Sequence, residues 1–161
     1  MKKRVSISTY GWIISICSTI LLLAGFVSAI KQQNATWVVC LIGAAIALLF
    51  LSVLFYMPLS ISVDSESLNI NRSLRIKSIP LSEIKSVELF SPTLNRAIKI
   101  CGSSGWFGWY GWFKDREHGK YFAYYGDNSN CFLVTLHDGK KYAVGCNDAP
   151  MMVDEIKKLI S

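Results

Sequence analysis

Charged side chains are missing from two long stretches of this sequence. Gly11 to Ile30 and Thr36 to Tyr56 contain no Asp, Glu, Lys, Arg or His. Each stretch has about 20 residues, the length that an α-helix needs to cross the roughly 30 Å hydrocarbon layer of a bilayer. The sequence therefore predicts a transmembrane helical hairpin. Without ionisable groups at membrane depth, a transporter or channel is not expected.

A cleaved secretory signal peptide is the alternative interpretation of the first stretch. Met1 to Arg4 make a basic start, and Val27-Ser28-Ala29 resembles a cleavage site. The apolar stretch is longer than the roughly 7–15 residues of a signal core, and a second span follows after only Lys31 to Ala35. Length therefore favours an uncleaved hairpin with spans at about 11–30 and 36–56.

Basic residues flank the outer ends of the two spans and are scarce between them. Outside the spans are Lys2, Lys3, Arg4, Arg72, Arg75 and Lys77, and between them is Lys31. Because basic residues favour the cytoplasmic side, both termini are expected in the cytoplasm and the protein in the inner membrane. We divide the chain into an N-terminal and transmembrane part, residues 1–57, and a cytoplasmic domain, residues 58–161.

Net charge and cysteine spacing exclude two further classes. Residues 57–161 carry 13 Lys and Arg against 11 Asp and Glu, which gives no nucleic-acid footprint. The five cysteines are odd in number, and no two have a C-x-x-C spacing. We interpret them as small buried thiols in a reducing compartment, not as a disulfide framework or a zinc site.

Signatures of catalysis are also missing. The two histidines are His118, beside Asp115 and Glu117, and His137, before a predicted turn. The sequence has no HExxH, P-loop or GxSxG motif around them. We interpret both as loop or turn residues, and we expect no catalytic residue, no cofactor and no metal.

Alternating apolar and polar residues after Pro58 predict a mainly β domain. Asp127 to Asn130 and Asp138-Gly139 are strong turn signals, which predict that the strands on either side pair as hairpins. Gly102 to Lys120 is interpreted as a long irregular insertion. The predicted strands lie at 59–63, 68–70, 74–79, 87–89, 98–100, 121–125, 131–136 and 141–145.

The last residues predict an amphipathic helix. Asn147 to Pro150 provide a capping side chain and an early proline. One face of the helix then collects Met152, Val153, Ile156, Leu159 and Ile160. We expect about seven antiparallel strands in a bent sheet or partly open barrel, with this helix over its open end.

This order of elements resembles the bacterial pleckstrin-homology-like (PH-like) domains that follow two transmembrane helices. The resemblance is carried by Ile79 to Glu88, by Gly105 to Phe113 continuing to Tyr121, and by Asp138 to Tyr142 with Asn147 to Pro150. It covers roughly residues 58–161 and implies a PH-like fold without an activity. In eukaryotic PH domains that bind phosphoinositides, basic residues gather at the first hairpin. Here that turn, Val63 to Ser67, is acidic and would repel a phosphorylated head group.

The run from Gly105 to Phe113 is the most informative part of the domain. Its rings either complete the core or lie at the membrane interface, where indoles and phenols are favoured. Lys114, Arg116 and Lys120 flank the run and could meet anionic head groups. The predicted membrane or partner contacts are Trp106, Phe107, Trp109, Tyr110, Trp112, Phe113, Lys114 and Arg116.

The expected function is that of a non-enzymatic, membrane-anchored PH-like interaction or scaffold module. The alternative is a lipid-interacting or envelope-stress regulatory protein that contacts the bilayer through residues 105–113. The expected partners are the lipid bilayer and another protein, with a homo-oligomer as a further option and no nucleic acid.

Overall fold

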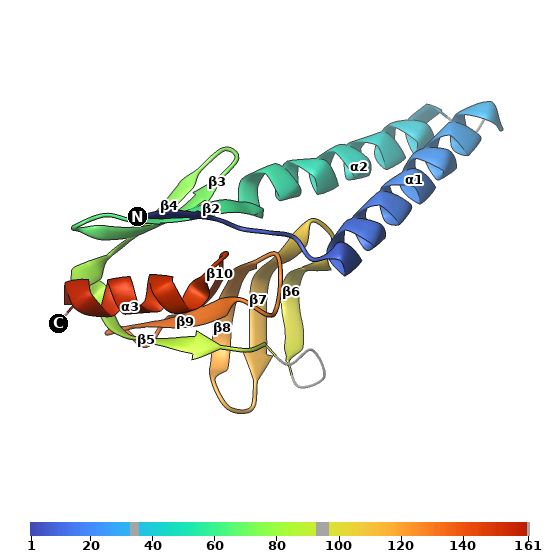
Figure 1. Cartoon of the computed structure of the whole chain (residues 1–161). Coiled ribbons are helices and arrows are strands. Elements are labelled where there is room, and N and C mark those ends of the chain that lie inside the picture. The colour runs from blue at the N-terminus through green and yellow to red at the C-terminus, as the bar shows by residue number, and fades with distance from the viewer. Residues whose placement is uncertain (33–35, 93–96, 161) are drawn as a thin grey trace.

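Two long helices project from a β domain in the computed structural model, which describes residues 1–32, 36–92 and 97–160 (Figure 1). Helix α1 spans Thr9–Lys31 and α2 spans Thr36–Tyr56. The connection expected between the spans lies partly outside the described residues. The helices are close at Gly43, where a Cβ atom would lie 3.4 Å from the ring of Phe26, and they diverge toward the domain (Figure 1).

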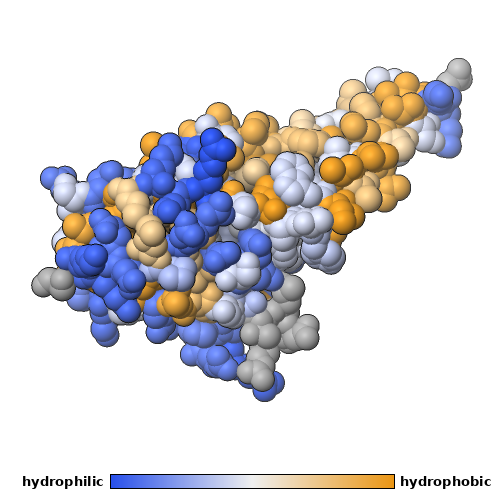
Figure 2. Space-filling model, in the orientation of Figure 1, coloured by the Kyte–Doolittle hydropathy of each residue, from blue (hydrophilic) through white to orange (hydrophobic). Residues whose placement is uncertain are grey.

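The two helices are long and apolar enough to span a membrane. Only 11 % and 6 % of the residues in their most apolar stretches are buried, whereas a core helix of a soluble protein is mostly buried. Figure 2 shows the contrast between the hydrophobic surface of the helices and the largely hydrophilic surface of the domain. The apolar surface of the helices therefore faces outward along most of their length.

The domain contains two β-sheets that do not close into a barrel. The first has the order β1-β2-β3-β4 and is antiparallel, and the second has the order β5-β9-β10-β8-β7-β6, in which β10 and β8 are parallel. The predicted fold class is confirmed, with ten described strands in place of about seven. The strands are β1 (Lys2–Arg4), β2 (Pro58–Val63), β3 (Ser67–Arg72), β4 (Ile76–Pro80), β5 (Ile84–Phe90), β6 (Ile98–Gly105), β7 (Gly108–Asp115), β8 (Gly119–Tyr125), β9 (Cys131–Leu136) and β10 (Lys141–Gly145), with a 3₁₀ turn at Leu81–Glu83.

The main core lies between the two sheets and the C-terminal helix α3 (Ala149–Ile160). Met152, Val153 and Ile156 on the inner face of α3 are at most 3 % exposed, as the helical periodicity predicts. Leu159, expected on the same face, is 42 % exposed. The helix covers the open side between the sheets (Figure 1), where its apolar stripe is removed from water.

The prediction that Gly102–Lys120 form an irregular insertion is wrong. These residues belong to β6, β7 and the start of β8, which are consecutive antiparallel strands. The glycines that suggested irregularity face each other across the ladder, Gly102 opposite Gly111 and Gly105 opposite Gly108. A Cβ atom on Gly102 or Gly111 would lie 2.1 or 2.2 Å from a backbone oxygen of the other strand, so both positions require glycine.

The hairpin predicted at Asp127 to Asn130 is also wrong, although the turn exists. The amide of Ser129 donates a hydrogen bond to Asp127 Oδ1 at 3.0 Å. The strands that this turn joins are not neighbours, because β10 lies between β8 and β9. The hairpin predicted at Asp138-Gly139 is confirmed, since β9 and β10 pair antiparallel there.

The segment before the first helix is part of a sheet. Strand β1 precedes α1 and pairs antiparallel with β2, which follows α2. The amide of Asn147 donates a hydrogen bond to the carbonyl of Arg4 at 2.9 Å, and Lys3 Nζ lies 2.8 Å from Asp148 Oδ2. The outer ends of both helices are therefore held at the same β domain.

Candidate binding cleft between the helices and the sheet

The aromatic run folds as a tight hairpin whose turn is Trp106-Phe107. Gly105 and Gly108 pair at the ends of β6 and β7, with φ angles of +107° and +111°. Phe107 has a φ of +53°, in the left-handed region that costs a non-glycine residue about 1–2 kcal/mol. Contacts that the turn makes with the helices have to offset this cost.

The turn lies between the domain ends of the two helices (Figure 1). The ring of Phe107 meets Trp12 of α1 edge-on, with the centroids 6.2 Å apart. The ring of Trp106 meets Phe50 of α2 at 5.6 Å and the ring of Phe107 at 5.5 Å. These four rings form a continuous row from one helix to the other, which we call the aromatic wedge.

A buried hydroxyl on α1 also holds the turn. Ser15 is fully buried, and its Oγ accepts a hydrogen bond from the backbone amide of Phe107 at 2.7 Å. The same hydroxyl donates to the carbonyl of Gly11 at 2.6 Å. A Cβ atom at Gly11 would lie 3.3 Å from the carbonyl oxygen of Gly105, so a small residue at this position permits the close approach.

Two of the predicted contact residues belong to the core instead of the helix junction. Trp109 and Phe113 lie on the opposite face of β7 and are 3 % and 4 % exposed. Trp109 stacks on Tyr125 with the centroids 5.8 Å apart, and Phe113 stacks on Tyr121 at 6.2 Å. These rings fill a second apolar cluster of the domain.

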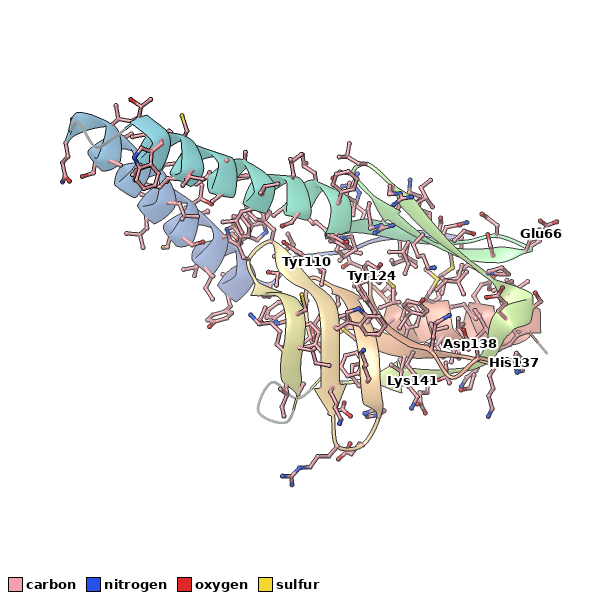
Figure 3. All side chains as sticks on the ribbon, turned by 180° about the vertical axis from the view of Figure 1, so that it is seen from behind. Glu66, Tyr110, Tyr124, His137, Asp138 and Lys141 are labelled. Atoms are coloured by element: carbon pink, nitrogen blue, oxygen red, sulfur yellow. The ribbon has the colours of Figure 1, made fainter. Side chains whose placement is uncertain are left out.

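Tyr110 connects the sheet to α2 (Figure 3). Its ring stacks on Tyr56 at 6.2 Å and 7°. Burial raises the pKa of Tyr110, although the nearby hydroxyls of Ser52 of α2 and Ser103 of β6 act in the opposite direction. The phenol therefore stays protonated at neutral pH and can donate within this cluster.

Beside the wedge, between the two helices and the sheet, is a cleft of about 740 Å³, which falls in the range of small-molecule sites. One wall comes from the facing sides of α1 and α2, and the other from β6, β7 and β8. Its lining residues are Ile14, Ser18, Leu22, Leu49, Ser52, Tyr56, Lys99, Cys101, Gly102, Ser103, Ser104, Trp106, Tyr110, Gly111, Trp112 and Phe122. The cleft joins surfaces far apart in the sequence.

A model of the bacterial PH domain family matches residues 59–160, from β2 to α3. The chain belongs to this family. The match confirms the resemblance seen in the sequence, and the fold agrees with it. No curated protein and no solved structure matches the chain.

Lys114 and Arg116 lie at the other end of β7 from the wedge. Lys114 is six positions beyond Gly108, or about 20 Å along the strand. Arg116 is exposed in the following turn. The eight predicted contact residues therefore lie in four different places. Trp106 and Phe107 belong to the wedge, Trp109 and Phe113 to the core, and Tyr110 and Trp112 to the cleft, whereas Lys114 and Arg116 lie at the far end of β7.

Neither histidine is among the residues that line the cleft. His118 Nδ1 lies 3.0 Å from Asp115 Oδ2, and the ring packs edge-on against Phe90 at 4.9 Å. His137 lies at the end of the PH domain remote from the helices (Figure 3). Within the described ranges, no group of three His, Cys, Asp or Glu could hold a metal ion.

Sequence reasoning missed the helix side of the junction. Ser15, Ser52 and Tyr56 contact the hairpin, but they were interpreted only as parts of apolar spans. The available signal was a few hydroxyl side chains within otherwise apolar helices, which often mark a contact with another element. Their partners in β6 and β7 are about 50 to 90 residues away and could not be identified from spacing alone.

Proposed function

We infer that this protein is a non-catalytic binding module of the bacterial inner membrane, with both termini in the cytoplasm. Its two helices span the bilayer, and its PH domain is held in a fixed position against the membrane surface. The aromatic wedge carries this inference, because a domain on a free tether would not insert a hairpin between its own anchoring helices. From the domain ends of the helices, the wedge reaches about 5 Å along α1, at Trp12, and about 9 Å along α2, at Phe50, near the head-group layer.

The strand pairing supports a single side for both ends of the chain. Since β1 precedes α1 and pairs with β2 after α2, the two helices must cross and return. The basic residues Lys2, Lys3 and Arg4 stand on this side of the spans. By the positive-inside rule this side is the cytoplasm.

The position of the acidic first turn favours a membrane contact at the opposite end of the domain. Glu66 lies in the β2–β3 turn, far from the helices (Figure 3). A head group in the bilayer surface would be out of reach of this turn. Lipid contact through the helix-proximal cleft is therefore the binding mode that the geometry supports best, as in the lipid-interacting alternative predicted from the sequence.

Cysteine accessibility tests the anchoring and its direction. In a cysteine-free full-length protein we would introduce Lys2→Cys, Lys31→Cys or Lys140→Cys and treat intact cells with a membrane-impermeant maleimide. We expect labelling of the Lys31 variant in intact cells and of the other two only after permeabilisation. All three proteins should stay in the membrane during carbonate extraction.

Two results would contradict the proposal in different ways. Labelling of the Lys140 variant in intact cells would reverse the orientation. Release of the protein by carbonate would exclude the two spans and with them the anchored module.

A further inference from the structure

We propose that the cleft binds one anionic membrane lipid, with an acyl chain between the two helices and the head group near Lys120. This inference rests on the proposed function, because it requires that α1 and α2 span the bilayer. It goes further by naming the class of ligand and the residues that contact it.

The helix wall lies at the depth of the acyl chains. On α1 the lining residues Ile14, Ser18 and Leu22 are four positions apart and form one stripe. Leu22 is about 20 Å along the axis from the start of α1, and Leu49 is about 10 Å from the end of α2. A space at this depth is surrounded by hydrocarbon and is filled most favourably by hydrocarbon.

The serines of this wall add little polarity. Ser18 Oγ donates to the carbonyl of Ile14 at 2.6 Å, and Ser52 Oγ donates to the carbonyl of Leu49 at 2.7 Å. Hydroxyls that bond to the backbone of their own helix leave a mainly apolar surface. The wall is thus suited to a methylene chain.

The aromatic wedge prevents the helices from closing this space. At the far end a small residue, Gly43, admits the ring of Phe26, whereas at the domain end four rings keep the helices apart. The cleft is therefore a consequence of the docked hairpin and persists as long as the hairpin stays in place.

The sheet wall carries the positive charge. Lys120 Nζ lies 4.4 Å from the centroid of Trp112, whose ring lines the cleft. Trp112 is two positions beyond Tyr110, or about 7 Å along the strand from the level of the helix ends. Lys99 also lines the cleft, and among its lining residues within the described chain there is no acidic side chain. This places cations within the head-group layer, where they favour an anionic lipid.

The probe for this site is phosphatidylglycerol with brominated acyl chains, since bromine quenches a tryptophan that it touches. The full-length protein would carry Trp12→Phe, Trp37→Phe and Trp112→Phe in proteoliposomes. Trp106 lines the cleft and meets Phe50 of α2, so it lies beside the space proposed for the acyl chain. Trp106 then reports on the cleft, and Trp109, only 3 % exposed on the other face of β7, is an internal reference.

We expect strong quenching of Trp106, and we expect unbrominated phosphatidylglycerol to relieve it at several-fold lower concentration than phosphatidylcholine. Ser18→Phe fills the helix wall and should reduce the quenching at least fivefold. The matched control is Leu21→Phe, on an outward position of the same helix that is 72 % exposed, which should have no effect. Leu49→Phe on α2 provides a second filling variant if Ser18→Phe does not fold. Lys99→Gln and Lys120→Gln together should abolish the preference for the anionic lipid.

A variant that retains only Trp37 and Trp109 separates the two proposals, because Trp37 is 67 % exposed on α2. Quenching of Trp37 without quenching of Trp106 would overturn the lipid site and leave the membrane anchor intact. No quenching of either would refute the anchor itself. Equal relief by the two lipids would overturn the assignment of the head group to Lys120.

Discussion

At the scale of single residues, Tyr121 has an unusual environment. It is fully buried in the second apolar cluster, and its hydroxyl has no hydrogen-bond partner among the residues that the structure describes. Burial raises the pKa of Tyr121 to about 12, and the negative charge of Asp115 adds to the effect. A buried polar group without a partner lowers the stability of the folded state.

Tyr121→Phe is therefore expected to retain or raise the free energy of unfolding, by up to about 1 kcal/mol, because it removes an unpaired hydroxyl. The pH dependence has a definite sign. The unfolded tyrosine ionises near pH 10 and the folded one near 12, so the stability that this group contributes is constant below pH 10 and lost between these values. Thermal unfolding in detergent from pH 8 to 12 should show a smaller alkaline loss for the variant. A loss identical to that of the parent would contradict this account.

At the scale of elements, the contact between α1 and the β6–β7 turn includes a hydrogen bond from the turn to a buried hydroxyl of α1. Ser15 and Ser18 both donate to a carbonyl of their own helix, at 2.6 Å in each case. Only Ser15 also accepts the amide of Phe107. Ser18 is therefore a matched control for Ser15, because the two residues differ in the hydrogen bond that Ser15 accepts from the amide of Phe107.

Ser15→Ala should weaken the docking of the turn by about 1–3 kcal/mol, since it leaves a buried amide without its acceptor. Hydrogen exchange of the Phe107 amide should become roughly 10- to 100-fold faster. Ser18→Ala should leave this amide unchanged. Equal protection in both variants would show that the rings hold the turn without the hydroxyl.

The elements also show why part of the prediction failed. The strands at 131–136 and 141–145 have regular alternation and a two-residue turn signal, and both were predicted with the bounds that the structure has. In β6 and β7 a glycine recurs at every third residue, and this interrupts the alternation of apolar and polar side chains by which a strand is recognised in a sequence. Their role becomes visible only across the ladder, where Gly102 meets Gly111, because a one-dimensional pattern does not contain this pairing.

At the scale of the whole molecule, the aromatic wedge determines how the domain stands relative to the helices. Replacing Trp106 and Phe107 together by glycine should preserve the hairpin, since glycine accepts the positive φ of position 107 without steric strain. The ring contacts with Trp12 and Phe50 would be lost. We expect the domain to fold normally and to lose its fixed orientation.

Spin labels at Lys31→Cys and Lys140→Cys, in a cysteine-free protein, would measure this orientation. The distance distribution should be narrow in the parent and clearly broader in the double-glycine variant. A matched control is the replacement of Arg116 and Glu117 by glycine in the turn at the other end of β7, which should leave the distribution narrow. Equal widths in all three proteins would refute the role of the wedge.

The sequence by itself determined the two apolar helices, the positions of most strands, the amphipathic C-terminal helix and the family. These features follow from periodicity and length, which act between near neighbours in the chain. The tertiary structure decided that β10 lies between β8 and β9, that β1 joins the first sheet, and that neighbouring rings of one aromatic run have different environments. It also decided the cleft, because contacts such as that of Ser15 with Phe107 join residues 92 positions apart. Such pairs depend on how all the elements pack together, and no local pattern encodes them.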